Sequence, residues 1–458
     1  MPWQNFSHIT GIFQNTGLFG GFVALGFIIC VGLFFFSDSG KWMIKPIVLL
    51  ILCTILTFQV SASGSRASWV ATVIVIGFLL YRFVRKFRFS SLLGSRTKQS
   101  GIVISILVLC LLIFSVFFLN HLYHLKKDSA NGRLLIAKVS MNMVKDSPLF
   151  GTGISGFRTQ YLNYQADYFQ QHPDSPWANL AGDTENPFNE FLKILVEQGI
   201  IGLLLFFGIL YCLFEPDSSL KCPQSTILQS VILFILIFGL FSYPSDKIPF
   251  VALLVFSIAG LSKRKNPVFN VQLKKMRLLR ILVLFTFCLV LGKIAEDVYK
   301  YAQSCRNWNQ ALASFSINRE RSLLQLKELY PELENNPVFL TTYGKALSYG
   351  MHYTEAITVL EKAVKRQPLS ASYIELGKSY EADGFPERAI GCWTRAGWMV
   401  PSLFTPLYLA MKLHFKNGEC DTAREQAGQL LTKRIKIDKP EIDSMKREAR
   451  IILNFNPP

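Results

Sequence analysis

The first two thirds of the chain alternate between long apolar runs and short polar segments. The eight apolar runs lie at about residues 17–36, 44–60, 68–81, 102–122, 199–214, 227–241, 250–261 and 278–294. Runs of about 17–25 apolar residues cross a bilayer as helices, because lipid offers no hydrogen-bond partner to an open backbone. The third, fifth and seventh runs are brief, and the fifth reaches back as far as Phe191 on its widest limits. The pattern predicts a polytopic helical membrane domain.

Composition and charge fit a membrane protein. The 458 residues are 50% hydrophobic and 17% charged, whereas average soluble proteins carry about 25% charged residues. The net charge is +17, but Lys and Arg gather at the ends of apolar runs, where the positive-inside rule explains them. A nucleic-acid partner is not expected, since it would need a folded basic face. The nine cysteines form no C-x-x-C pair and show no zinc spacing, so no metal site is predicted.

Basic residues set the expected orientation of the spans. The segments 82–98 and 262–280 are rich in Lys and Arg and should face the cytoplasm. An even number of spans separates them, so the two assignments agree. Parity then places the loop near Arg66, the segment 123–190 and everything after about residue 295 on the outer face. Met1 also falls outside with no signal peptide before it, so we expect further spans upstream, or else a short translocated tail.

The last third of the chain changes to amphipathic helices with an internal repeat. Four small or helix-ending residues recur 33 positions later: Gly344, Ala356, Ala363, Pro368, and then Gly377, Ala389, Ala396, Pro401. The spacing resembles the tetratricopeptide repeat, whose period is about 34 residues. Weaker units fall around Ala410 and over 300–335. Stacked repeats form a concave surface, so this domain is expected to bind a protein or an extended ligand, or else to act only as a stabilising cap.

Together these patterns predict an all-α chain, with a polytopic helical membrane domain and a soluble α-helical repeat domain. The expected parts are transmembrane helices at 1–122, an exported catalytic loop at 123–190, transmembrane helices at 191–294 and an exported repeat domain at 300–458. The exported loop opens with an amphipathic helix over 133–145, and Gly151, Gly153 and Gly156 follow within six residues. Such glycines permit tight turns and close approach of a ligand, although a plain helix stop is the simpler interpretation.

Four short motifs resemble segments of the O-antigen ligase and polymerase superfamily. They are residues 10–16, residues 65–69, residues 132–161, and Asn189 followed after nine residues by Gly199 and after two more by Gly202. All four occur in order over about residues 10–260, on the expected membrane faces. Many ligases carry a His directly before the Asn of the last motif, whereas this chain has Phe188 there. A mechanism that needs that His therefore does not carry over directly.

The resemblance implies a metal-independent glycosyltransferase that needs no cofactor. Proteins of this kind take a glycan from a polyprenyl-diphosphate donor and join it to a hydroxyl of lipid A core, of another glycan or of a protein. The resemblance places the chain in the bacterial inner membrane, with transfer on the periplasmic face and membrane lipids around it. A protein partner at the repeat domain is expected from the repeats themselves. Ligation of a finished glycan and polymerisation of repeat units both stay open.

Three arginines are expected to bind the diphosphate: Arg66, Arg133 and Arg158. All three fall on the outer face by parity and within the motifs that carry the resemblance. A guanidinium group suits this role because it stays charged and donates two parallel hydrogen bonds to phosphate. The plainer alternatives are a snorkelling interfacial anchor for Arg66 and solvated surface charges for the other two.

Three residues near the last motif are candidate catalytic bases, namely Glu185, Glu190 and His172. A carboxylate beside apolar span ends accepts a proton near neutral pH if burial raises its pKa. The alternatives are a helix-start carboxylate for Glu190 and an ordinary loop residue for His172. Asn189 either orients substrate or caps the helix that begins there. The motif glycines are expected to serve backbone turns and packing: Gly151, Gly153, Gly199 and Gly202.

Two other classes of function compete with glycan transfer. A non-enzymatic, membrane-anchored scaffold for envelope polysaccharide assembly would explain the repeats and the missing His, but not the Arg-bearing loop. A transporter would carry ionisable residues in mid-span or paired broken helices, and these spans show almost none. Loss of transfer on replacing Arg66 or Arg158 would separate an enzyme from a scaffold.

Overall fold

The structure is a computed structural model, and it describes residues 10–36, 63–86, 127–214, 223–262 and 277–455. These ranges contain sixteen α-helices and two 3₁₀ helices, and they hold no strand. The expected all-α class is confirmed for them. The predicted spans at 44–60 and 102–122 lie outside the described residues.

The chain divides into two compact units. The first unit comprises Met1–Ile154 and Asn186–Val268, and the second comprises Ser155–Glu185 and Phe269–Pro458. The segment 123–190, expected as one exported loop, therefore supplies residues to both units.

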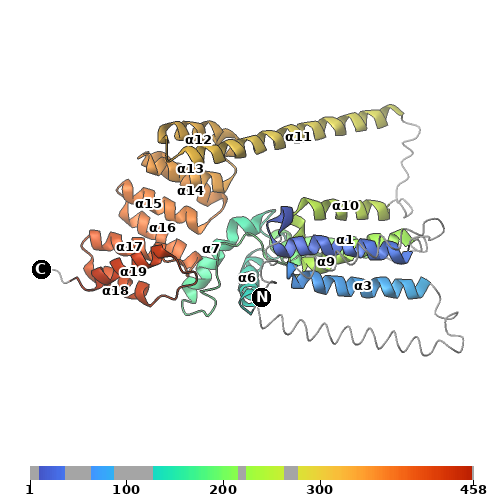
Figure 1. The fold of residues 1–458 in the computed structure, drawn as a ribbon, viewed down its shortest axis with the longest axis horizontal. Helices are drawn as coiled ribbons and strands as arrows, with labels where there is room; N and C mark the ends of the chain where they lie inside the picture. Colours follow the sequence, from blue (N-terminus) through green and yellow to red (C-terminus); the bar gives the residue numbers. More distant parts are fainter. Residues whose placement is uncertain (1–9, 37–62, 87–126, 215–222, 263–276, 456–458) are drawn as a thin grey trace, which may run out of the picture. The chain divides into compact units, whose positions relative to one another are not determined.

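Four helices of the first unit pack side by side: α1 (Thr16–Phe36), α3 (Arg66–Lys86), α9 (Pro223–Gly239) and α10 (Ile248–Ser262) (Figure 1). Their shared core is apolar and aromatic, and the rings of Phe238 and Phe250 stack with centroids 5.7 Å apart. A Cβ on Gly21 of α1 would overlap the Phe238 ring. Small residues therefore let these apolar helices approach closely.

Two described helices are long and apolar enough to cross a membrane, α1 over Thr16–Leu33 and α8 (Glu190–Phe214). Two shorter apolar helices, Gln224–Gly239 and Ile248–Ser262, correspond to α9 and α10. The runs at 68–81 and 278–294 fall within α3 and α11 (Arg277–Ser314). The apolar pattern therefore located helices wherever the structure describes the predicted runs, while their passage through a membrane stays a prediction.

The second unit is a stack of helices that follow one another along the chain (Figure 1). After α11 come α12 (Arg319–Leu333), α13 (Pro337–Tyr349), α14 (Tyr353–Arg366), α15 (Ser370–Ala382), α16 (Pro386–Met399), α17 (Thr405–Lys416), α18 (Cys420–Thr432) and α19 (Pro440–Leu453). A Cβ on Gly344 would overlap Leu360 of the next helix. One repeat later, a Cβ on Gly377 would overlap Trp393. The repeated glycines therefore let paired helices cross closely; the tetratricopeptide assignment stays a prediction.

One helix from the middle of the sequence, α7 (Gly156–Gln171), belongs to this second unit and packs against α16. The side chain of Gln165 is only 1% exposed and its polar atoms are satisfied. Its amide donates to the carbonyl oxygens of Met399 at 2.6 Å and Gly182 at 3.2 Å. The hydroxyl of Tyr161 donates to its side-chain oxygen at 2.9 Å.

Further polar contacts attach α7 and the residues that follow it to the repeat helices. The carboxylate of Asp183 accepts hydrogen bonds from the backbone N–H and the hydroxyl of Ser370, at 3.2 and 2.6 Å. The guanidinium of Arg395 donates to Asp167 at 2.6 Å. Residues 155–185 are therefore held by the repeat helices through buried and specific contacts.

Candidate functional site

Two glycine motifs of the sequence meet in the first unit as one backbone contact. The turn that follows α6 (Lys127–Asp146) is inserted where α8 is broken at Gly199. The N–H groups of Thr152 and Gly153 donate to carbonyls of α8 before the break, each at 2.9 Å. The N–H of Ile200, after the break, donates to the carbonyl of Pro148 at 2.9 Å. The turn thus supplies the hydrogen bonds that the interrupted helix has lost.

This contact explains why glycine stands on both sides of it. Gly199 has φ +67° and Gly151 has φ +69°, values that favour glycine. A Cβ on Gly199 would overlap the carbonyl group of Leu149, and a Cβ on Gly151 would lie 2.5 Å from a backbone carbon of α8. Gly153 also has a positive φ, of +88°, but faces open space. Gly202 is close only to the side chain of Gln198.

The first unit also contains a polar cavity of about 190 Å³. The first turns of three helices contribute to it, through Thr16 and Gly17 of α1, Arg66 and Ala67 of α3, and Ser129 of α6. Its remaining lining includes Arg133, Phe188, Ser242 and Tyr243. Helix N-termini carry partial positive charge and open N–H groups, so their convergence favours an anion.

The two arginines predicted in this unit meet at the cavity. Burial, and then the charge of Arg66, lower the pKa of the Arg133 guanidinium from its usual value. The Arg133 guanidinium also stacks over the Phe188 ring at 5.3 Å from its centroid. The described lining of the cavity includes no carboxylate and no histidine. Two cations that face each other there are stabilised by a bound anion.

Phe188 replaces the histidine of the motif in a demanding backbone conformation. Its φ is +54°, in the left-handed region that bulky residues rarely adopt. Its ring lies edge-on to Tyr243, with centroids 5.3 Å apart, and beneath Arg133. The phenyl ring therefore supports the arginine and the tyrosine, and provides no acid or base.

Tyr243 is a cavity residue that the sequence analysis missed. Its hydroxyl oxygen accepts a hydrogen bond from the side-chain amide of Asn15 at 3.2 Å. The only signal for it in the sequence is its place just beyond the apolar run 227–241, on the expected outer side.

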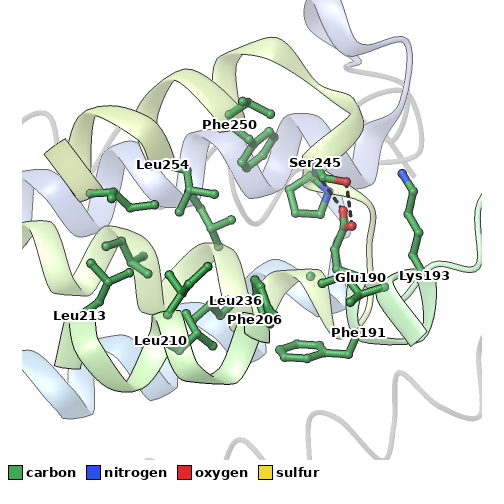
Figure 2. A pocket seen from close by; sticks show the side chains of 18 of the residues that line it. Glu190, Phe191, Lys193, Phe206, Leu210, Leu213, Leu236, Ser245, Phe250 and Leu254 are labelled. Carbon is green, nitrogen blue, oxygen red and sulfur yellow. Dashed lines mark hydrogen bonds between the residues drawn. The ribbon is translucent and has the colours of Figure 1, made fainter. Parts of the chain in front are cut away.

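Asn189 and Glu190 take structural parts at the start of α8. The Asn189 side chain accepts from the N–H of Leu192 at 3.0 Å and so caps the helix. The Glu190 carboxylate accepts from the N–H and the hydroxyl of Ser245, at 2.8 and 2.7 Å (Figure 2). Lys193 pairs with Asp246 at 2.5 Å. Two links thus tie α8 to the 3₁₀ turn Pro244–Asp246, directly after Tyr243.

A second, apolar cavity of about 450 Å³ lies between α8, α9 and α10. Figure 2 shows the polar side chains Glu190, Lys193 and Ser245 together at one end, while apolar residues such as Leu213 and Leu254 line the rest. Both cavities share the turn 242–245 as a wall, since Tyr243 lines the polar one and Ser245 the apolar one.

The other predicted site residues lie in the second unit. Arg158 pairs with Glu185 at 3.3 Å, and both side chains are about half exposed, at 46% and 47%. The ring of His172 stacks on Tyr168 with centroids 4.7 Å apart, and its Nδ1 donates to the Tyr168 carbonyl at 3.0 Å. The structure therefore brings Arg66 and Arg133 together in one unit, and Arg158 and Glu185 together in the other.

Residues 47–207 match the family model described as O-Antigen ligase. The ligase match covers about a third of the chain and contains every site residue predicted from the sequence, whereas Asn15 and Tyr243 lie outside it. A search of curated proteins finds no match to the chain. The match supports a relationship to the O-antigen ligase superfamily and an enzymatic role in glycan assembly. Among the described residues, no three His, Cys, Asp or Glu side chains gather where they could share a metal ion.

Proposed function

We propose that this protein transfers a glycan from a polyprenyl-diphosphate donor to a hydroxyl acceptor on the outer face of a membrane. The observation that carries the proposal is the polar cavity where Arg66, Arg133 and the N-termini of three helices converge. Its volume of about 190 Å³ suits a diphosphate group better than a whole sugar chain. Both arginines lie within the ligase match.

The proposed reaction is a direct displacement. The acceptor oxygen attacks the anomeric carbon, the bond from that carbon to the diphosphate oxygen breaks, and the bonding pair leaves with the diphosphate. Arg66 and Arg133 stabilise the charge that develops on this leaving group. The acceptor proton passes to solvent or to a carboxylate. Glu190 is a poor candidate base, because both of its oxygens already accept hydrogen bonds from Ser245.

The apolar cavity between α8, α9 and α10 suits the hydrocarbon chain of the same donor. It is large, about 450 Å³, and three of its polar side chains, those of Glu190, Lys193 and Ser245, lie together at one end, near the shared turn 242–245. A lipid with its diphosphate at the polar cavity and its first isoprene units in the apolar one would match both linings. Burial of such a chain contributes about 25 cal/mol for each Å² of apolar surface removed from water.

The topology proposed with this reaction is that of a multi-pass protein of the bacterial inner membrane, with its transmembrane helices at 1–122 and 191–294. The loop 123–190 and the repeat domain 300–458 then face the periplasm. The acceptor is lipid A core, another glycan or a protein, and the repeat domain, of tetratricopeptide type, binds a protein partner. A non-enzymatic scaffold is the second candidate function, and Phe188 in place of the motif His is the observation that favours it.

The decisive experiment replaces the cavity arginines. Arg133→Ala should abolish long glycan chains in cells and let the lipid-linked donor accumulate, and Arg66→Ala should do the same. Arg133→Lys should retain partial transfer, because the charge stays but the two-pronged hydrogen bonding is lost. Lys145→Ala is the matched control, an exposed cation on the same helix. Normal glycan chains in both alanine variants, at normal protein levels in the membrane, would favour the scaffold.

A further inference from the structure

The position of Tyr243 is fixed from several directions. Its ring packs edge-on against Phe188, and the Phe188 ring also contacts Arg133. The next residues, Pro244–Asp246, form a 3₁₀ turn that is tied to α8 by Ser245 and Asp246. Tyr243, which lines the polar cavity, is thus held at both its ring and its backbone.

Asn15 determines which way the hydrogen bonds of that hydroxyl run. The side-chain oxygen of Asn15 accepts from the N–H of Leu18 at 3.1 Å, because Asn15 caps α1. The other half of the amide, its NH₂, must therefore face Tyr243, where it donates at 3.2 Å. An oxygen that accepts from Asn15 directs its own hydrogen elsewhere. A cavity ligand that contacts this hydroxyl would therefore meet it as a donor.

We propose that the Tyr243 hydroxyl donates a hydrogen bond to the diphosphate of the donor lipid, as a third ligand beside Arg66 and Arg133. The inference rests on the proposed function of the polar cavity and adds a binding residue from outside the ligase match. No proton is transferred from Tyr243. The hydrogen bond strengthens as charge develops on the leaving diphosphate, as it does for donors aimed at an oxyanion.

Inorganic pyrophosphate is a probe that does not depend on knowing the glycan. Its affinity for the purified full chain is measured by calorimetry in detergent, with Tyr243→Phe as the main variant. This variant removes one oxygen and keeps the ring against Phe188. Its affinity should fall about 10-fold to 100-fold, the range for a hydrogen bond to a charged group. An unchanged thermal unfolding temperature would show that the loss is not structural.

Asn15→Asp keeps the Tyr243 hydroxyl but changes the group to which it donates its hydrogen bond. One oxygen of the new carboxylate still caps α1, and the other accepts from Tyr243, which then donates to position 15 and no longer to the cavity. The variant should lose more affinity than Tyr243→Phe, because Asn15 also lines the anion cavity and the carboxylate adds a negative charge there. The double variant Asn15→Asp/Tyr243→Phe should lose no more than Asn15→Asp alone, because Asn15→Asp already removes the hydrogen bond from Tyr243 to the cavity.

The possible outcomes test three separate claims: the role of Tyr243, the direction of its hydrogen bond and the anion cavity itself. If Tyr243→Phe binds pyrophosphate as the unchanged protein does while Arg133→Ala does not, the role of Tyr243 is wrong and the proposed function stands. If the double variant binds pyrophosphate markedly more weakly than Asn15→Asp alone, Tyr243 still donates to the cavity in Asn15→Asp, and the hydrogen-bond direction is wrong. If neither the unchanged protein nor Arg133→Ala binds pyrophosphate measurably, the anion cavity itself is wrong, and the proposed function is lost with the role of Tyr243.

Discussion

Met351 occupies a backbone position that glycine fills in the neighbouring repeat. Met351 has φ +66°, and Gly384, 33 residues later, has φ +86° at the turn between the next pair of helices. The left-handed conformation costs a residue with a side chain about 1–2 kcal/mol. The Met351 side chain is 74% exposed, so its removal forfeits little burial.

Met351→Gly should therefore raise the free energy of unfolding of the second unit by about 1 kcal/mol, after the greater freedom of glycine in the unfolded chain is subtracted. Met351→Ala is the control, because alanine keeps the strain and loses the same side chain. The measurement is thermal unfolding together with amide exchange across α13 and α14. Equal stabilisation by Ala and Gly would show that the backbone strain is not the cause.

At the level of single residues, sequence patterns identified the arginines of the polar cavity but not the uncharged residues that line it with them. Arg66 and Arg133 were predicted from the membrane face and the motifs, and they do meet at one cavity. Tyr243 was missed because its partner Asn15 lies 228 residues away, and only the packing of the helices brings them together. Arg158 was also predicted to bind the diphosphate, and it lies in the second unit, whereas Arg66 and Arg133 lie in the first.

The contact between the turn 148–153 and α8 is the feature of local structure on which the first unit most depends. Gly199→Ala would put a methyl group into the carbonyl of Leu149 and also impose a left-handed conformation on alanine. The two penalties together should cost about 3 kcal/mol or more. Gly208→Ala is the control, since Gly208 lies in the same helix with nothing within 4 Å, and alanine there should stabilise α8 by up to about 1 kcal/mol.

The measurement for this pair is the amount and the unfolding temperature of the protein extracted from membranes. Gly199→Ala should lower both and abolish transfer, while Gly208→Ala should leave all three near their original values. If the two variants behave alike, the inserted turn is not required for folding.

Periodicity predicted helices better than it predicted their ends and breaks. The apolar runs correctly predicted the positions of α1, α3, α8, α9 and α10, because an apolar stretch is visible in composition alone. The break at Gly199 was not predicted, because it is compensated by hydrogen bonds from a turn about 50 residues earlier. α11 continues to Ser314, well beyond the run that ends at 294, because its C-terminal part packs in the repeat unit.

At the scale of the whole molecule, the repeat unit and residues 155–185 are interdependent. Deleting 300–458 would separate a scaffold from a catalyst only if residues 155–185 folded without the repeats. Gln165, however, is buried against the Met399 carbonyl, and Asp183 is bonded to Ser370. Deletion removes those partners and should disorder α7, whether or not the repeats bind a partner protein. A loss of function on deletion therefore says little about partner binding.

Gln165→Leu addresses the same question while the repeats stay in place. Leucine fills the site but leaves the carbonyls of Met399 and Gly182 without their donor, at a cost of about 1–3 kcal/mol each if no water reaches them. Amide exchange in residues 155–185 of the full chain should quicken while α12–α14 stay protected, and Gln170→Leu, exposed on the same helix, should change neither. Unchanged exchange in α7 would show that the attachment does not hold the segment.

If amide exchange in residues 155–185 quickens and glycan transfer falls with it, residues of this segment take part in the reaction. If exchange quickens and transfer persists, Arg158, Glu185 and His172 are not site residues, and the chemistry belongs to the cavity of Arg66 and Arg133.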